Sequence, residues 1–406
     1  TFKTSIEGSA FGAGVAASSV LYLILAMIMG IALYRGRLAL WKVTLIFLPF
    51  LLGIIWLGPR LPEWVLAPLS GLSVKQWDAI LLLYCLIASI IPVWLLLQPR
   101  GYMGGWFLYL VIFIGLAGAL CGGFGIEYPA INLSGLKSLA NGKNIFPILF
   151  ITIACGACSG FHGIVSSGTT SKQVKKERDS IPITYGAMLL EGLVAALAIV
   201  TVIILPKNNP LLKADPNLIY AGGIARSLGL FNIPYEAGLL FALLAFSTFV
   251  YDTLDVCTRL ARYILQELTG LSSKKGGLIC GIASVFLPFV FLMASKEKGY
   301  LAAWPLFGAS NQLLASIILL AVSVWLIHLG RRPWYTILPM IFMWTVTSWA
   351  LVNLSLPFVK SLFNLSGGVF PSADTWLLGL CGILLLGLSL MLIMEAGRVL
   401  FFRERR

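Results

Sequence analysis

Long apolar runs follow one another along the whole chain and are separated by shorter polar segments. Each run holds roughly 20 residues, the length that a helix needs to cross a hydrocarbon core of about 30 Å. The apolar positions are contiguous and do not alternate as they do in the strands of a membrane β-barrel. We therefore expect an all-α polytopic membrane protein with about eleven transmembrane helices. The predicted spans lie near 14–34, 41–57, 78–98, 105–121, 146–166, 183–205, 236–258, 276–294, 303–328, 335–355 and 376–396.

Composition and charge agree with this interpretation. Charged residues make up 11% of the chain, against roughly 25% in a soluble domain. The net charge of +13 comes largely from short basic connections such as "SKQVKKERDS" and from the tail "FFRERR". Short basic segments are typical of the cytoplasmic side of a membrane, so we expect a cytoplasmic C-terminus, a small extracellular loop at 206–235 and no nucleic-acid partner.

If the basic connections lie in the cytoplasm and the predicted spans cross the membrane in turn, the first residue, Thr1, lies outside the cell. The chain begins without a methionine or a signal peptide. We therefore expect that further spans precede it in the natural protein. No soluble domain is evident, and residues 1–406 are interpreted as one transmembrane domain.

Residues 154–173, "ACGACSGFHGIVSSGTTSKQ", carry more glycine and hydroxyl groups than a membrane helix usually tolerates. Each glycine weakens a helix by up to about 1 kcal/mol relative to alanine. Non-helical backbone at membrane depth occurs where it is buried or lines a wet cavity, and broken helices form sites in transporters. We expect a break that lines a substrate site, with close helix packing as the alternative. The candidate binding residues here are Gly156, Ser159, Gly160, His162, Ser166, Ser167 and Thr169.

The same stretch contains a possible metal or redox motif. Cys155 and Cys158 form a CxxC pair, and His162 lies four residues beyond Cys158. A structural zinc site needs four ligands, and no second pair follows nearby. We expect no metal and no cofactor, and we interpret the seven cysteines of the chain as packing residues.

Two further spans are expected to be interrupted. Residues 251–270 extend an apolar run beyond the length that a bilayer needs, so the helix must bend, break or project from it. Asp255 and Arg259 lie four residues apart there and can pair on one helix face. Two interpretations remain open for this pair, an ion pair at the membrane interface and a gating or coupling pair.

The other expected interruption is at 302–317, where Pro305 and Gly308 precede Asn311 and Gln312. The two amides either coordinate a substrate or hold helices together. Glu191 lies well inside its own predicted span. A carboxyl group there either couples transport to protons or forms a structural hydrogen bond in its protonated form.

Four strings resemble the carbon starvation protein A family of bacterial inner-membrane transporters. They are "FPILFITIACGACSGFHGIVSSGTTSKQ", "YGAMLLEGLVA", "LDVCTRLARYILQELTG" and "WPLFGASNQLLA", within a similarity that runs from about residue 35 to about residue 330. Asp255, Thr258 and Arg259 match the family pattern, which reads "LDAGTR" where this chain has "LDVCTR". The Gly/Pro-rich N-terminal motif of the family has no counterpart here, so the family's N-terminal spans are expected to be missing.

The resemblance implies secondary transport of peptides or pyruvate during carbon starvation, in the inner membrane. It also implies an inverted-repeat, LeuT-like architecture built around broken helices. On this basis we expect a symporter coupled to protons rather than to sodium ions. The segment 155–163 would bind a substrate carboxylate through backbone amides, His162 would bind or relay a proton, Glu191 or Asp255 would carry the coupling proton, and Arg259 would gate.

Two other classes of function were weighed. A membrane-embedded enzyme would need His162 with Glu191, or Cys158 with His162, as its working pair. The chain has only two histidines and no nucleophile elbow, so we expect no enzyme activity. A membrane sensor would need a signalling domain, which the chain lacks. The sequence leaves the oligomeric state open, with a homo-oligomer among the alternatives.

Overall fold

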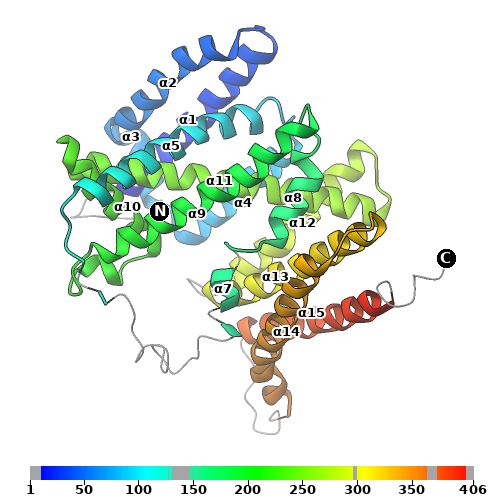
Figure 1. Ribbon diagram of the computed structural model, residues 1–406. Coiled ribbons are helices and arrows are strands. Elements are labelled where there is room, and N and C mark those ends of the chain that lie inside the picture. The colour runs from blue at the N-terminus through cyan, green and yellow to red at the C-terminus, as the bar shows by residue number, and fades with distance from the viewer. Residues whose placement is uncertain are drawn as a thin grey trace. The chain divides into compact units, whose positions relative to one another are not determined.

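The computed structural model of the protein describes residues 11–126, 128–129, 147–148, 150–154, 156–295, 300–363 and 373–398. Every regular element in these ranges is a helix, and no strand occurs in them (Figure 1). The helices form two compact units. The first unit contains residues 1–129 and 182–290, and the second contains residues 130–181 and 291–406.

Nine helices of the described ranges are long and apolar enough to cross a membrane. A tenth candidate is the bent pair α3 (Glu63–Gly71) and α4 (Val74–Ile90), whose axes meet at 105°. The expectation of an all-α polytopic membrane protein is confirmed, while the figure of eleven crossings stays a prediction. The predicted span at 146–166 has no single long helix of its own, because its backbone is broken.

The first unit is built around one long helix, α11 (Tyr235–Thr269), which packs against α1, α4, α5 and α10. Its core includes Tyr22, Phe107, Ile224 and Leu243, all completely or almost completely buried. The other helices of this unit are α1 (Phe11–Tyr34), α2 (Leu40–Leu57), α5 (Leu97–Cys121), α9 (Ala187–Ile203), α10 (Pro216–Leu228) and α12 (Lys274–Ala294, of which residues to Val290 belong here).

Local sequence signals fix the ends of the helices that form the site described below. Ser73 and Gln76 form a capping box at the start of α4, which satisfies two backbone amides that the first helical turn leaves unpaired. Gly270 follows α11 with a φ of 71°, a left-handed conformation that glycine adopts without strain.

Two connecting segments differ from expectation. The basic string "QPRGYMGG", expected as a loop, lies within the N-terminal turns of α5, so Arg100 is a helical residue. The segment 206–235, expected as a small extracellular loop, contains α10, whose residues Ala221, Ile224 and Ala225 are buried in the first unit. The apolar face of α10 explains the difference, because a helix with such a face buries it against the core.

The second unit contains the long helices α13 (Tyr300–His328), α14 (Trp334–Phe363) and α15 (Ala373–Gly397), with α14 packed against both others. Two short helices, α7 (Phe150–Ala154) and α8 (Gly160–Val165), pack against α13. A π-helical turn, Ser166–Thr170, continues from α8. Ile151, Ala309, Val346, Ala350 and Leu351 form the main buried apolar cluster of this unit.

The three expected interruptions have different outcomes. The break in 154–173 is present, because residues 156–159 separate α7 from α8. The interruptions expected in 251–270 and 302–317 are wrong, because α11 and α13 are continuous through them. Pro305 lies close to the start of α13, where a missing amide proton removes only one hydrogen bond from a long ladder.

Candidate functional site

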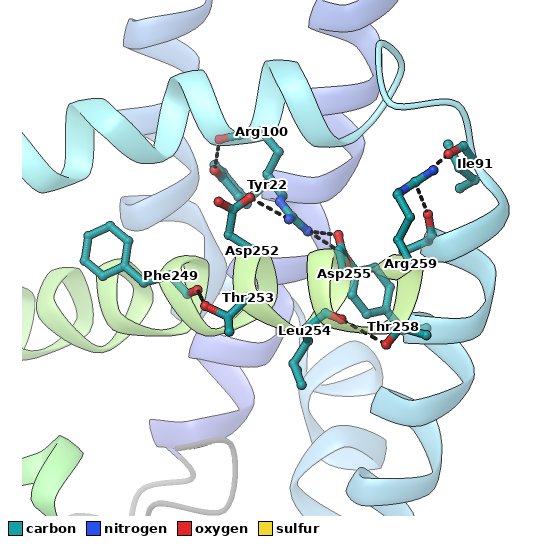
Figure 2. A network of polar contacts seen from close by, with 12 residues as sticks. Tyr22, Ile91, Arg100, Phe249, Asp252, Thr253, Leu254, Asp255, Thr258 and Arg259 are labelled. Carbon is teal, nitrogen blue, oxygen red and sulfur yellow. Dashed lines mark hydrogen bonds and ion pairs between the residues drawn. The ribbon is translucent and has the colours of Figure 1, made fainter. Parts of the chain in front are cut away.

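A buried arginine of α5, Arg100, lies against two aspartates of α11 (Figure 2). Its Nη2 is 2.7 Å from Oδ1 of Asp252, and its Nη1 pairs with Oδ2 of Asp255. The side chains of Arg100 and Asp255 are each 1% exposed, whereas that of Asp252 is 47% exposed. One carboxylate is therefore an enclosed counter-ion of Arg100, and the other is accessible.

Two tyrosines add hydrogen bonds to this cluster, in which Nε of Arg100 and Oδ1 of Asp255 have no hydrogen-bond partner among the described residues. Arg100 Nη1 donates to the hydroxyl of Tyr84 over 2.6 Å, and that hydroxyl donates to Oδ2 of Asp255 over 2.9 Å. The hydroxyl of Tyr22 donates to the carbonyl oxygen of Arg100 over 2.7 Å. Buried charges are tolerated only when they are paired and hydrogen-bonded, and the four helices α1, α4, α5 and α11 each contribute to this pairing.

A cavity of about 250 Å³ lies beside the ion pairs. Three closely spaced glycines of α5, Gly101, Gly104 and Gly105, form one side of it and project no side chains into the space. The complete lining is Tyr22, Arg100, Gly101, Gly104, Gly105, Leu108, Thr248, Phe249, Asp252 and Thr253. A small solute in this cavity would meet a cation and a carboxylate on an otherwise largely apolar wall.

Arg259, also on α11, has different partners from the expected one, and its gating role stays a prediction. Its Nη2 donates to the carbonyl oxygens of Ala88 and Ile91, each over 2.7 Å, at the C-terminal end of α4 (Figure 2). The expected pair of Asp255 with Arg259 is therefore corrected, because Asp255 is occupied by Arg100 of another helix. The hydroxyl of Thr258 donates within its own helix, to the carbonyl of Leu254 over 2.9 Å.

In the second unit, Asn311 of α13 holds the start of α8. Its Oδ1 accepts hydrogen bonds from the backbone amide of Phe161 over 2.7 Å and from the hydroxyl of Ser159 over 3.3 Å. Ser159 is the N-cap of α8, since its Oγ accepts from the amide of His162 over 3.4 Å. A Cβ atom at Gly160 would lie 2.4 Å from the backbone nitrogen of Ala315. The break is thus docked tightly onto α13.

The other predicted residues of the second unit do not converge on one point. Gly156 and His162 are exposed. The hydroxyls of Ser166, Ser167 and Thr169 donate to carbonyls of the preceding turn, those of Gly163, Ile164 and Val165. Gln312 is completely buried, and neither atom of its amide has a hydrogen-bond partner.

Glu191 and the CxxC pair complete the set of predicted positions. Glu191 lies on α9 with an exposed side chain, and it forms no ion pair with any described residue. Cys155 lies outside the described residues. Within the described ranges no three histidine, cysteine or acidic side chains gather as metal ligands.

Sequence reasoning missed Arg100 and Tyr84 as parts of a site. Arg100 falls between the predicted spans 78–98 and 105–121, so the apolar pattern alone places it in a short basic connection. The spacing of Gly101, Gly104 and Gly105 was the signal that could have located it, since these positions share one face of a helix. A small-residue face beside an arginine indicates close approach of another element or room for a ligand.

The comparisons with known proteins agree on one family. The family model described as "Carbon starvation protein CstA" matches residues 4–221 and 208–350. A protein named peptide transporter CstA, from Helicobacter pylori, is 32% identical over an alignment of 314 residues, and the alignment covers 61% of this chain and 45% of that relative. A pyruvate/proton symporter named BtsT, from Escherichia coli, is 30% identical over an alignment of 357 residues, and the alignment covers 66% of this chain and 49% of the relative.

A peptide transporter CstA from Bacillus subtilis is 28% identical over 374 residues, covering 79% of this chain and 61% of its own length. Relative to the first two proteins, the chain spans about half of the length of the curated relatives it matches. No solved structure matches it. Because the family model covers most of the sequence, including α1, α5 and α11, the chain belongs to the carbon starvation protein CstA family.

Proposed function

We propose that the protein is a secondary active transporter that imports peptides or pyruvate across the bacterial inner membrane, with protons as the coupling ion. The support from comparison is that its relatives are named as a peptide transporter and as a pyruvate/proton symporter. The observation that carries the proposal is the Arg100–Asp252–Asp255 cluster, which lies within apolar helices and borders a cavity. Ionisable groups in such segments commonly belong to substrate or ion pathways.

The composition of the cluster supports proton coupling over sodium coupling. The described cluster offers few oxygen ligands beyond these carboxylates and tyrosine hydroxyls, whereas hard cations prefer several oxygens. We therefore place the coupling proton on the aspartate pair, with Glu191 and His162 as the alternatives that the sequence carries.

We extend the proposal to architecture and to the second candidate region. The broken segment between α7 and α8 supports an inverted-repeat, LeuT-like arrangement of about eleven crossings. We propose that Ser159, Gly160 and Asn311 shape the substrate pathway in the second unit. In the first unit, we propose that Arg259 acts in gating by holding the C-terminal end of α4. The C-terminus is proposed to be cytoplasmic, and the chain to act in response to carbon starvation.

Transport is tested with the full chain reconstituted in proteoliposomes. Labelled pyruvate and a labelled dipeptide are supplied under an imposed proton gradient, a sodium gradient or neither. We expect accumulation of at least one solute under an inward proton gradient, and its loss with a protonophore. Accumulation that follows only the sodium gradient would overturn proton coupling.

Counterflow of label separates the classes of function. A transporter exchanges unchanged label across the bilayer, an enzyme converts it into another compound, and a sensor does neither. Failure of both solutes to accumulate or exchange would refute the proposed transport.

A further inference from the structure

We propose that Arg100 binds the carboxylate of the transported solute, and that Asp252 is the internal carboxylate that the solute displaces from it. This inference rests on the proposed transport function and names the chemical class of its substrate and the residue that recognises it. The expected ligand is a small carboxylic acid or the C-terminus of a short peptide.

The two aspartates are suited to different tasks. Asp255 is enclosed, with a side chain 1% exposed, and is bound to both Arg100 and the hydroxyl of Tyr84. Asp252 contacts Arg100 from a position that is 47% exposed and lines the cavity. Asp255 can therefore remain as a fixed counter-ion, while Asp252 can turn away into the cavity without leaving a charge sealed in the protein.

The guanidinium of Arg100 has an incompletely used edge. Its Nη2 donates to a single oxygen of Asp252, and its Nε is buried without a hydrogen-bond partner in the part of the chain that the structure describes. A guanidinium presents Nε–H and one Nη–H group along a common edge, and this edge binds a carboxylate through two parallel hydrogen bonds. A buried donor without an acceptor is unfavourable, so a ligand carboxylate that reaches Nε relieves a cost that the unliganded site carries.

The residues that line the cavity leave space for a ligand beside Arg100 and offer few other charged groups that could bind it. A Cβ atom at Gly101 would lie 3.8 Å from Oδ1 of Asp252, and one at Gly104 would lie 3.6 Å from the hydroxyl of Tyr22. Larger side chains at these positions would occupy the space beside Arg100. The hydroxyls of Thr248 and Thr253 donate to carbonyls of their own helix. Arg100 and Asp252 are the only charged groups among the described residues that line the cavity.

Asp252 and a solute carboxylate compete for the same edge of Arg100. A side chain without charge at position 252 removes this competition, because a neutral amide oxygen accepts more weakly from a guanidinium than a carboxylate does.

The test is equilibrium binding to the purified full chain in detergent, measured by calorimetry at about pH 7. The probes are pyruvate and alanylalanine, each compared with its neutral amide, pyruvamide or alanylalaninamide. We expect the natural chain to prefer a carboxylate over its amide. Asp252→Asn should bind the carboxylate about tenfold more tightly than the natural chain, because no internal carboxylate then competes for Arg100.

Two further variants probe recognition and space. Arg100→Lys should lose most of the preference for carboxylate over amide, because an ammonium group cannot bind bidentately. Gly104→Leu should abolish binding by filling the cavity, whereas its control Gly104→Ala should retain it, since its Cβ has ordinary contact distances. Arg60 does not line this cavity, so Arg60→Lys serves as the control for an arginine-to-lysine change that keeps the charge.

Several outcomes would overturn the inference. They are an unchanged carboxylate affinity in Asp252→Asn, an unchanged carboxylate preference in Arg100→Lys, full binding in Gly104→Leu, or no binding of any probe by the natural chain. If Arg100→Lys does not fold, Asp252→Asn and the Gly104 pair decide the question. Proteoliposome uptake without these binding effects refutes this site alone, whereas carboxylate binding without uptake refutes the proposed transport and leaves the site.

Discussion

Two arginines of the first unit are almost equally buried but have different kinds of partner. Arg100, at 1% exposure, contacts carboxylates, and Arg259, at 3%, contacts the backbone carbonyls of Ala88 and Ile91. Carbonyls at the end of a helix have no partner within that helix, and a cation there is favoured by the helix dipole. Arg259 therefore stabilises the corner between α4 and α5, which places Arg100 nearby.

Replacing Arg259 with methionine should lower the free energy of unfolding of the protein by roughly 2–5 kcal/mol, because two carbonyl groups lose their donor. Arg259→Lys should lose less, since an ammonium group can still donate. The measurement is denaturant or thermal unfolding in detergent micelles. Arg331→Met, at an exposed position after α13, is the matched control and should be nearly neutral. A stability of Arg259→Met equal to that of this control would show that the hydrogen bonds of Arg259 to Ala88 and Ile91 do not stabilise the protein.

At the scale of single elements, the distinctive feature is the pair of short helices α7 and α8. The backbone amide of Phe161, in the first turn of α8, donates to Oδ1 of Asn311 in place of a carbonyl of its own helix. Gly160 allows α8 to approach the backbone of α13 closely. A helix as short as α8 is not stable by itself. Its conformation therefore depends on this contact with α13.

Gly160→Ala should disrupt the docking of α8, because its Cβ would lie 2.4 Å from a backbone nitrogen and 2.5 Å from the carbonyl oxygen of Asn311. Backbone atoms cannot move aside cheaply, so we expect a loss of about 1–3 kcal/mol in stability. Gly156→Ala is the control within the same segment, since its nearest contact would be 3.7 Å away. Hydrogen exchange of the amides of residues 160–165 measures the effect. Equal protection in the two variants would show that α8 does not need a glycine at position 160.

The sequence predicted helices better than it predicted partners. Apolar run length identified the helical class, and the glycines of 154–173 located the break. The continuity of α11 and α13 could not be predicted from proline and charged residues alone, because tertiary packing stabilises a helix through such positions. Arg100 and Asp255 are separated by 155 positions, and Phe161 and Asn311 by 150. Contacts across such distances depend on how helices pack, which the local pattern does not record.

At the scale of the whole molecule, the nine or ten candidate spans found in the described residues, and the basic connections along the chain, indicate which ends of the helices face the cytoplasm. The short segments "SKQVKKERDS" and "LGRRP" and the tail "FFRERR" share a strong positive charge. Such segments remain preferentially in the cytoplasm. The proposed orientation of the chain depends on this rule.

A green fluorescent protein fused after Arg406 should fluoresce, and alkaline phosphatase fused at the same position should be inactive. Fluorescent protein matures in the cytoplasm, whereas the phosphatase needs the periplasm to form its disulfides. Phosphatase inserted near Asn208, in the segment 206–235, is the control for the opposite side and should be active. An active phosphatase at the C-terminus would reverse the proposed topology.

Because α11 is one unbroken helix, it connects the Arg100–Asp252–Asp255 cluster with the contact that Arg259 makes on α4. Its 35 residues span about 52 Å as one rod, well beyond a hydrocarbon core of about 30 Å. Asp252 and Arg259 lie two turns apart along this rod, about 10 Å, and on nearly the same face. A tilt of α11 as one rigid rod therefore changes both contacts, whereas a rotation of the Asp252 side chain changes only its contact with Arg100.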